Sequence, residues 1–179
     1  MKEYKLRSTV TRTGSKASRW ADKAVILGIC ALLVFALFRF ILIPVRVRND
    51  KMHGLAGGEL LLVDRISRFV SDYTLGDIVR IRLSGRYDLF RVAAEGGSTY
   101  RVSGGRAYLD DALLDESEYS AGWPEGLELY AEVPEDSLLL LPDDRTDITS
   151  LDEFVVRYND VYGEVRFRIA PLNKLAFFC

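Results

Sequence analysis

The 179-residue chain has only two cysteines and one histidine, which leaves few residues for several kinds of chemistry. Cys30 lies within an apolar run and Cys179 is the last residue, so we expect two unpaired thiols. One histidine and no thiol pair at ligand spacing argue against a metal site. A Ser-His-Asp triad would need His53, and no serine is close to it in sequence. The composition therefore predicts no metal, no cofactor and no histidine-dependent serine hydrolase.

Basic charge is concentrated at the start of the chain. Residues 1–23 contain seven lysines and arginines but only two acidic residues, so the rest of the chain carries −7 of a total net charge of −2. This tail is polar and is interrupted by glycine and serine, which is typical of disorder. The acidic remainder argues against nucleic acid as a partner.

An apolar run from Ala24 to Val45 contains fifteen Leu, Ile, Val or Phe residues and one charge, Arg39. As a helix it would be about 33 Å long, enough to cross a hydrocarbon core of about 30 Å. Arg39 would cost about 3 kcal/mol at mid-bilayer, against about 7 kcal/mol from the apolar side chains, and its guanidinium can reach the headgroups. The run therefore predicts a transmembrane helix.

Two alternatives to a retained anchor are a cleaved signal peptide and a lipoprotein signal that uses Cys30. No small residues follow the apolar core as cleavage requires, and the large Ile29 precedes Cys30. The basic flank predicts a cytoplasmic N-terminus. We expect a single-pass protein of the cell membrane with a cytoplasmic tail (1–23), a transmembrane anchor (24–45) and an extracytoplasmic domain (46–179).

Beyond the anchor, apolar and polar residues alternate, which is typical of half-buried strands. This alternation covers residues 79–83, 127–133 and 164–169, while residues 60–63 and 138–141 are continuous apolar runs that predict strands buried on both faces. Residues 100–103 and 106–109 flank Gly104-Gly105, which predicts a hairpin. We expect a mainly β domain, an antiparallel barrel or folded sheet, with a helical turn near 149–156 capped by Thr149 or Ser150.

The stretch from Val45 to Val63 resembles, without gaps, the type I signal peptidase segment Val-x-x-x-x-Ser-Met-x-Pro-Thr-Leu-x-x-Gly-Asp-x-Leu-Leu-Val. Residues Leu55, Gly58, Leu61, Leu62 and Val63 are in register. Further blocks at 76–79, 90–97, 104–116, 133–136 with 141–145, and 150–152 follow in the family's order. The resemblance implies a signal-peptidase-like ectodomain of the S26 family behind one membrane helix.

The resemblance also implies that the catalytic groups are missing. The family uses a serine nucleophile, a neutral lysine as base, and a small or hydroxyl residue at the oxyanion. These positions hold Asp50, Phe90 and Arg48 in this chain. A phenyl ring cannot accept a proton, so the serine-lysine mechanism is lost and the protein resembles a pseudoenzyme.

Two other arrangements of an active site are conceivable, one with Lys51 as the base and one with Asp50 in a carboxylate pair. Lys51 is next to Asp50 and should stay charged, and an ammonium group cannot activate a hydroxyl. Asp50 would instead need to share a proton with Asp143, Asp144 or Asp152 to activate water. With such a rearranged site, the protein would still be an active signal peptidase. The simpler interpretations are a polar turn at 143–145, capped by its own charges, and an ion pair between Arg91 and Asp152 that the family positions suggest.

The peptide groove is then the feature expected to remain in use. In the family it holds an extended substrate by main-chain pairing, which needs no nucleophile. The candidate groove residues are Asp50, Lys51, Met52, His53 and Phe90. Serine-less members are associated with pilus gene clusters of Gram-positive bacteria, where they assist pilin polymerisation by a sortase. The resemblance implies an accessory factor for secreted preproteins, pilins or surface proteins, with sortase as a further partner; a tethered structural protein without a client remains an alternative.

Overall fold

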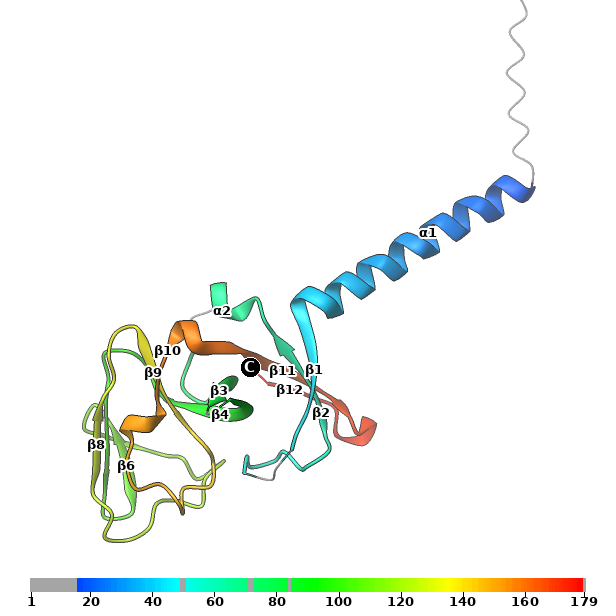
Figure 1. The fold of residues 1–179 in the computed structure, drawn as a ribbon. Coiled ribbons are helices and arrows are strands. Elements are labelled where there is room, and N and C mark those ends of the chain that lie inside the picture. The colour runs from blue at the N-terminus through cyan, green and yellow to red at the C-terminus, as the bar shows by residue number, and fades with distance from the viewer. Residues whose placement is uncertain (1–15, 49–50, 71–72, 84, 179) are drawn as a thin grey trace, which may run out of the picture. The chain divides into compact units, whose positions relative to one another are not determined.

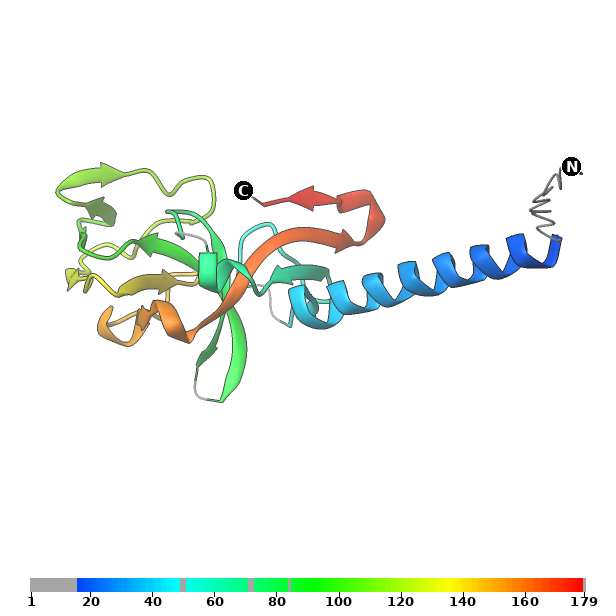
Figure 2. The same cartoon turned by 90° about the horizontal axis from the view of Figure 1, so that it is seen from above.

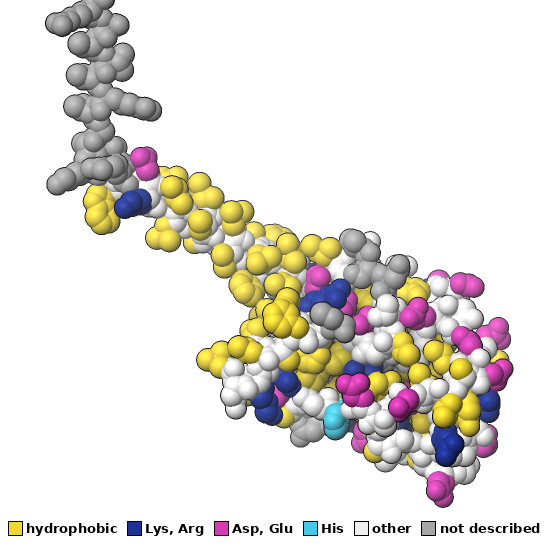
Figure 3. Space-filling model, turned by 180° about the vertical axis from the view of Figure 1, so that it is seen from behind, with side chains coloured by type: hydrophobic (Ala, Val, Ile, Leu, Met, Phe, Trp, Pro, Cys, Tyr) yellow, Lys and Arg dark blue, Asp and Glu magenta, His cyan; other side chains and the backbone are white. Residues whose placement is uncertain are grey.

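The computed structural model describes residues 16–48, 51–70, 73–83 and 85–178, and the chain falls into two compact units, 1–37 and 38–179. Helix α1 (Lys16–Ala36) continues into a π-helical turn, η1 (Leu37–Ile41). The 22 residues Trp20–Ile41 are long and apolar enough to cross a membrane. Figure 3 shows hydrophobic side chains along the visible face of this helix. The helix is compatible with the single-pass membrane protein expected from the sequence.

The helix ends four residues before Val45, the predicted end of the anchor. Residues Leu42–Arg46 instead form strand β1, which pairs antiparallel with β2 (Leu60–Asp64). Pro44 lies in β1 opposite Leu62. Proline disrupts a helix interior because it has no amide hydrogen and clashes with the preceding turn, but an edge strand tolerates it. Residues 42–45, which composition alone assigned to the anchor, therefore belong to β1 because they pair with β2.

The β unit contains two antiparallel sheets, which confirms the mainly β prediction (Figures 1 and 2). The larger has the order β1-β2-β11-β3-β4-β9-β10, with β12 beside β11. Its other strands are β3 (Ile78–Leu83), β4 (Arg86–Ala94), β9 (Ser137–Leu141), β10 (Val155–Arg157), β11 (Val161–Ala170) and β12 (Ala176–Phe177). The first part of β11 pairs with β3 and the rest with β2. One long strand thus joins the two halves of the sheet.

The smaller sheet has the order β7-β6-β5-β8 and lies to one side of the larger one (Figure 1). Its strands are β5 (Thr99–Ser103), β6 (Arg106–Leu109), β7 (Ala112–Leu114) and β8 (Leu129–Glu132). Gly104 and Gly105 join β5 to β6 with φ angles of 57° and 73°. A two-residue hairpin of this type requires positive φ at both positions, which glycine adopts without strain. The predicted hairpin is confirmed.

Strand β9 is buried along its whole length, as its apolar run predicted. Leu139 and Leu141 face a cluster built around Tyr100, Trp123 and the smaller sheet. Leu138 and Leu140 face a second cluster on the opposite side of the strand. Because both faces of β9 meet apolar side chains, alternation with polar residues is absent from its sequence.

The short helices are α2 (Ser67–Val70) and three 3₁₀ turns, η2 (Asp152–Phe154), η3 (Tyr158–Asp160) and η4 (Leu172–Lys174). The turn predicted near 149–156 is η2, but its N-cap is Leu151, which forms no side-chain capping bond. Ser150 Oγ accepts a bond from the Asp152 amide at 3.3 Å. Strand β10 follows at once, because residues 155–157 pair with β9 rather than extend the helix.

Candidate functional site

The loop around position 50 is anchored on its C-terminal side, although Asp50 itself lies outside the described residues. The side chains of Met52 and Leu55 are each only 2% exposed, in a cluster that also contains Val47. The Lys51 carbonyl accepts a hydrogen bond from the Asp144 amide at 3.2 Å. The buried side chains and the backbone bond hold this loop against the β unit.

Arg91 is paired with Asp143. Its Nε and Nη2 donate to the two oxygens of Asp143, each at 2.8 Å, and Nη1 donates to the carbonyl of Gly76 at 2.9 Å. The side chain of Asp143 is 3% exposed and also accepts the His53 amide at 2.8 Å. Such bidentate pairs are stronger than ordinary hydrogen bonds. Asp143 thus links β4 to the loop that follows position 50.

The predicted pair between Arg91 and Asp152 is wrong. Asp152 is exposed at the start of η2, and Arg91 uses its donors on Asp143 and Gly76. The physical reason is the strand register: Arg91 of β4 lies opposite Leu141 of β9, two residues before Asp143. Sequence separation alone could not reveal that register.

The polar turn predicted at 143–145 is only partly self-contained. Asp144 Oδ1 accepts bonds from the amide and hydroxyl of Thr146, at 3.1 and 2.6 Å, and these bonds lower the pKa of Asp144. Arg145 instead extends into the interior, where Nη2 donates to Glu116 Oε1 at 2.8 Å. Asp144 thus bonds within the turn, Asp143 bonds outside it, and Arg145 does both, since its Nη1 also donates to the nearby Pro142 carbonyl.

Phe90 is a core residue. It is 7% exposed and lies in the second apolar cluster, with its ring centroid 6.2 Å from that of Phe154. Leu89, whose side chain points to the other face of β4, packs against the cluster that holds Val47 and Met52. Phe90 lines neither of the cavities described below. Neither Leu89 nor Phe90 has an atom that could accept a proton.

Among the described residues, no serine or threonine hydroxyl is hydrogen-bonded to a lysine or histidine side chain. Ser67, one of the nearest serines to His53, is 1% exposed and donates to the Asp64 carbonyl at 2.8 Å. Within the same residues no three His, Cys, Asp or Glu side chains are grouped to hold a metal ion.

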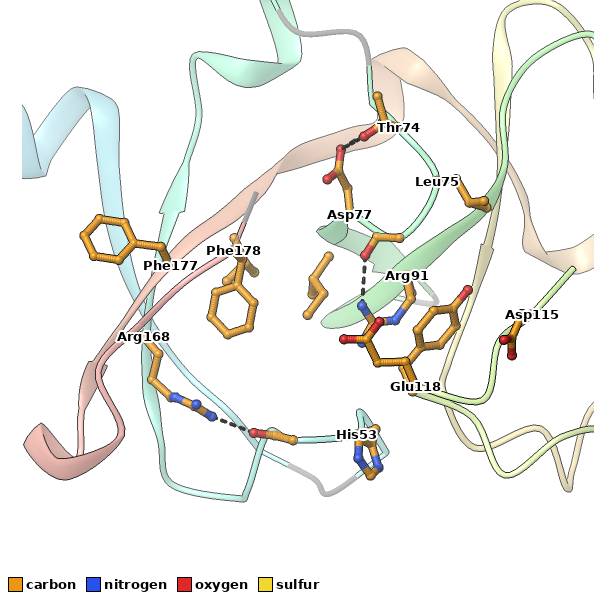
Figure 4. Close-up of a pocket in the computed structure, with 15 residues that line it drawn as sticks. His53, Thr74, Leu75, Asp77, Arg91, Asp115, Glu118, Arg168, Phe177 and Phe178 are labelled. Atoms are coloured by element: carbon orange, nitrogen blue, oxygen red, sulfur yellow. Dashed lines mark hydrogen bonds between the residues drawn. The ribbon is translucent and has the colours of Figure 1, made fainter.

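A pocket of about 530 Å³ lies beside His53 and Arg91 (Figure 4). Arg168 of β11 borders it and donates to the Gly54 carbonyl at 2.5 Å and to Glu59 at 3.1 Å. Burial of Glu59 opposes its ionisation, but hydrogen bonds from Arg168 and Lys174 outweigh this effect and lower its pKa. Phe177 and Phe178 line the same pocket. We name this cavity the His53 pocket.

A second cavity, of about 370 Å³, separates β1 from the β3–β4 hairpin. Its lining comprises residues 43–48, Arg80 and residues 85–89, and we name it the β1–β4 groove. Four of these residues are arginines: Arg46, Arg48, Arg80 and Arg86. Of the predicted site residues that the structure describes, Arg48 lies on this lining and His53 lines the pocket named after it, whereas Lys51 and Met52 line neither cavity.

Sequence reasoning missed the other arginines of the groove. Arg80 was identified only as a polar position that alternates with apolar residues of β3. The available signal was a local excess of arginine over acidic residues in 43–48 and 80–86. Its significance depends on the folding of the sheet, which brings these two segments to opposite sides of one cavity.

Comparison with known proteins places most of the chain in one family. A family model described as signal peptidase, peptidase S26, matches residues 19–170. A similar solved structure is that of a signal peptidase I from Enterococcus faecalis V583, with 18% sequence identity and a TM-score of 0.43; the similarity covers 52% of this chain and 96% of that one. No curated protein sequence matches. The family match runs from helix α1 to strand β11.

Proposed function

Because the chain belongs to the signal peptidase S26 family, we propose that it is a non-catalytic member that binds extended segments of secreted proteins at the outer membrane surface. The observation that carries this proposal is the position of Phe90. Its ring packs in the core where the resemblance places the lysine base, and adjacent Leu89 is equally unable to accept a proton. The family fold is retained while the base is replaced by hydrocarbon.

The backbone of β1 supports a binding role. β1 is an edge strand, paired with β2 on one side. Just beyond β1, Val47 uses both its amide and its carbonyl on the β2 side, through Glu59 and Gly58 at 2.9 and 2.8 Å. Backbone groups alternate in direction along an antiparallel strand, so those of Arg46 and Arg48 face away from β2. An extended segment can add to such an edge by main-chain hydrogen bonds.

The other side of the β1–β4 groove is also incompletely paired. β4 pairs with β3 from Arg86 onwards, but β9 joins β4 only from Arg91. Residues 86–89 therefore have a strand on one side and the groove on the other. The chain between Ile41 and Arg46 can span at most about 18 Å, so we infer that a client meets the groove close to the end of the membrane helix.

Pilins and surface proteins are the clients we propose, with a sortase as a further partner. This part of the proposal rests on the resemblance to serine-less, pilus-associated family members. Copurification of the full-length protein with pilin subunits and sortase would support it. Failure to associate with either under mild conditions would remove the pilus role.

The central test uses the full-length chain in nanodiscs of zwitterionic lipid, together with a fluorescent secreted preprotein that keeps its signal peptide. We expect the preprotein to bind and to stay intact, and a known active signal peptidase serves as the positive control. Cleavage that is abolished by Asp50→Ala would instead support an active peptidase with a rearranged site. If neither a preprotein nor a pilin subunit binds, the binding role is refuted.

A further inference from the structure

The β1–β4 groove has a strongly positive lining. Among the described lining residues, four are arginines, Arg46, Arg48, Arg80 and Arg86, and one, Asp88, is acidic. None of the four guanidinium groups has a carboxylate oxygen within 4.0 Å among the residues that the structure describes. The arginines elsewhere in the interior differ: Arg91, Arg145 and Arg168 each bind a carboxylate. On the described part of the lining, arginine therefore outnumbers acidic residues, and no ion pair joins these four arginines to a described carboxylate.

Arg80 is the clearest example of a groove arginine without an ion pair to a described carboxylate, because its side chain is only partly exposed to solvent. Its guanidinium carbon lies 4.2 Å from the ring centroid of Tyr87 and 5.1 Å from that of Tyr162. Burial lowers the pKa of Arg80; the two tyrosines oppose this effect and the nearby charge of Arg48 adds to it. The aromatic rings hold the guanidinium in place, but they leave its in-plane donors available for an anion.

Arg46 at the end of the edge strand and Arg48 just beyond it have a spacing that suits an extended partner. Both are exposed, while the intervening Val47 and the preceding Val45 pack in the apolar cluster, so the alternation of β1 continues to Arg48. Alternate residues of a segment paired with β1 would therefore meet arginine on one face. Opposite charges at directly facing positions stabilise such a pair.

We propose that the β1–β4 groove selects extended peptide segments that carry Asp or Glu at alternate positions. The proposal rests on the proposed function, since it names the chemistry of the segment that the groove holds. Main-chain groups of the segment pair with the edge of β1, and its carboxylates bind Arg46, Arg48, Arg80 and Arg86. A peptide fits better than another anion because the groove offers open strand backbone as well as positive charge.

The test measures binding of labelled decapeptides to the full-length protein in zwitterionic nanodiscs by fluorescence anisotropy at low salt. Three peptides alternate threonine with Asp, Asn or Lys, and a fourth is the Asp peptide with N-methyl groups on alternate amides. We expect the Asp peptide to bind at least about tenfold more tightly than the Asn peptide, since each exposed ion pair contributes a modest amount. N-methylation should remove binding, because charge alone would tolerate it.

Matched variants assign the effect to the groove. R46Q/R86Q removes two groove arginines, whereas R106Q/R157Q removes two exposed arginines of β6 and β10. The groove variant should weaken binding of the Asp peptide about tenfold and reduce its dependence on salt, while the control variant should leave both unchanged. Equal losses in the two variants would show a general charge effect and overturn the proposal.

Three further outcomes separate this proposal from the proposed function. Equal binding of the Asp and Asn peptides, in a groove that still binds preprotein, overturns the acidic preference alone. Absence of binding by every peptide and by preprotein overturns both. If phosphatidylglycerol in the nanodisc abolishes binding of the Asp peptide, the groove binds lipid headgroups and the peptide assignment is wrong.

Discussion

At the scale of single residues, Phe90 is the most informative position, because the family resemblance leads one to expect a lysine there and the chain has a phenyl ring. Phe90 lies in an apolar cluster with Phe154, so its surroundings could not accommodate a solvated amine without rearrangement. The side chain at position 90 is thus part of the stability of the fold.

Restoring serine at position 50 should not produce a protease. Asp50→Ser supplies a hydroxyl, but neither Leu89 nor Phe90 can remove its proton, and a serine without a base is a weak nucleophile. We expect no cleavage of a labelled preprotein above the level of the unmodified chain, measured by gel electrophoresis. Rapid processing by Asp50→Ser alone would mean that the base has been assigned to the wrong position.

Glu164 should make stability depend on pH near neutrality. Its residue is 2% exposed, and burial raises the pKa of the carboxyl from 4.5 to about 7; Asp77 adds to the shift and Arg166 opposes it. The folded state therefore retains a proton that the unfolded state releases. The stabilisation is complete below about pH 4.5 and is lost as the pH rises to about 7. Glu164→Gln should thus gain up to about 3 kcal/mol relative to the parent chain between these limits.

The measurement is the melting temperature of both proteins from pH 4 to 8. Glu164→Gln should flatten the decline above pH 4.5. The exposed Glu153→Gln serves as the control and should follow the parent curve. Parallel curves for the parent and Glu164→Gln would contradict the assignment of the shift to Glu164.

At the scale of elements, a buried polar network ties the smaller sheet to the turn after β9. Glu116, which follows β7, accepts from Arg145 at 2.8 Å, from the Tyr100 hydroxyl at 3.1 Å and from Trp123 Nε1 at 3.2 Å. Burial raises the pKa of Tyr100, and the charge of Glu116 adds to this effect. The tyrosine is therefore held as a neutral donor.

Removing the carboxylate from this network should destabilise the β unit. The side chains of Arg145 and Glu116 are 1% and 6% exposed, so Glu116→Ala leaves a guanidinium buried without its counter-charge. Losing one partner of a buried pair costs about 3–5 kcal/mol. Chemical denaturation of the purified protein measures the loss.

The exposed pair between Arg101 and Asp111 provides the matched control. Asp111 is 91% exposed and its Oδ1 lies 3.5 Å from Arg101 Nη2. Screening by solvent makes such pairs weak, so Asp111→Asn, which removes the charge and tolerates the positive φ of 63° at this position, should leave the denaturation midpoint almost unchanged. Similar losses for Glu116→Ala and Asp111→Asn would show that burial does not determine the strength of the network.

At the scale of the whole molecule, charge and hydropathy are arranged along the chain in the order expected of a membrane-anchored protein. A basic tail precedes an apolar helix, and an acidic β unit follows. The positive-inside rule favours a cytoplasmic tail. We therefore propose that the β unit, with its groove, lies outside the cell membrane.

Labelling of introduced cysteines tests this orientation. In a C30A/C179A background, the exposed Ser117→Cys should react with a membrane-impermeant maleimide on intact cells, while Ser15→Cys should react only after permeabilisation. Both variants should be labelled equally in detergent. The reverse pattern on intact cells would place the β unit in the cytoplasm.

Much of the fold could be predicted because it depends on local patterns. Alternation and apolar runs identified β3, β9 and much of β11, and Gly104-Gly105 identified the β5–β6 hairpin. The end of the helix was misplaced because the apolar residues 42–45 suit either a membrane helix or a strand. Only the available partner, β2, decides between the two.

The candidate site was less predictable because its contacts join distant parts of the chain. Arg91 and Asp143 are 52 residues apart, and Arg145 and Glu116 are 29 residues apart. Many carboxylates lie at comparable separations, so sequence could not select the correct partner. The arginines of the β1–β4 groove were missed for the same reason.

The sequence by itself determined the residue types: an apolar run long enough for a membrane helix, a β-forming pattern, and Asp50 and Phe90 in the stretches that resemble the family. Tertiary structure alone decided which described charges form ion pairs and which arginines line the groove. The physical reason is that strand register sets the distances between side chains. Electrostatic and hydrogen-bond energies depend on those distances and on burial, neither of which is fixed by the order of the residues.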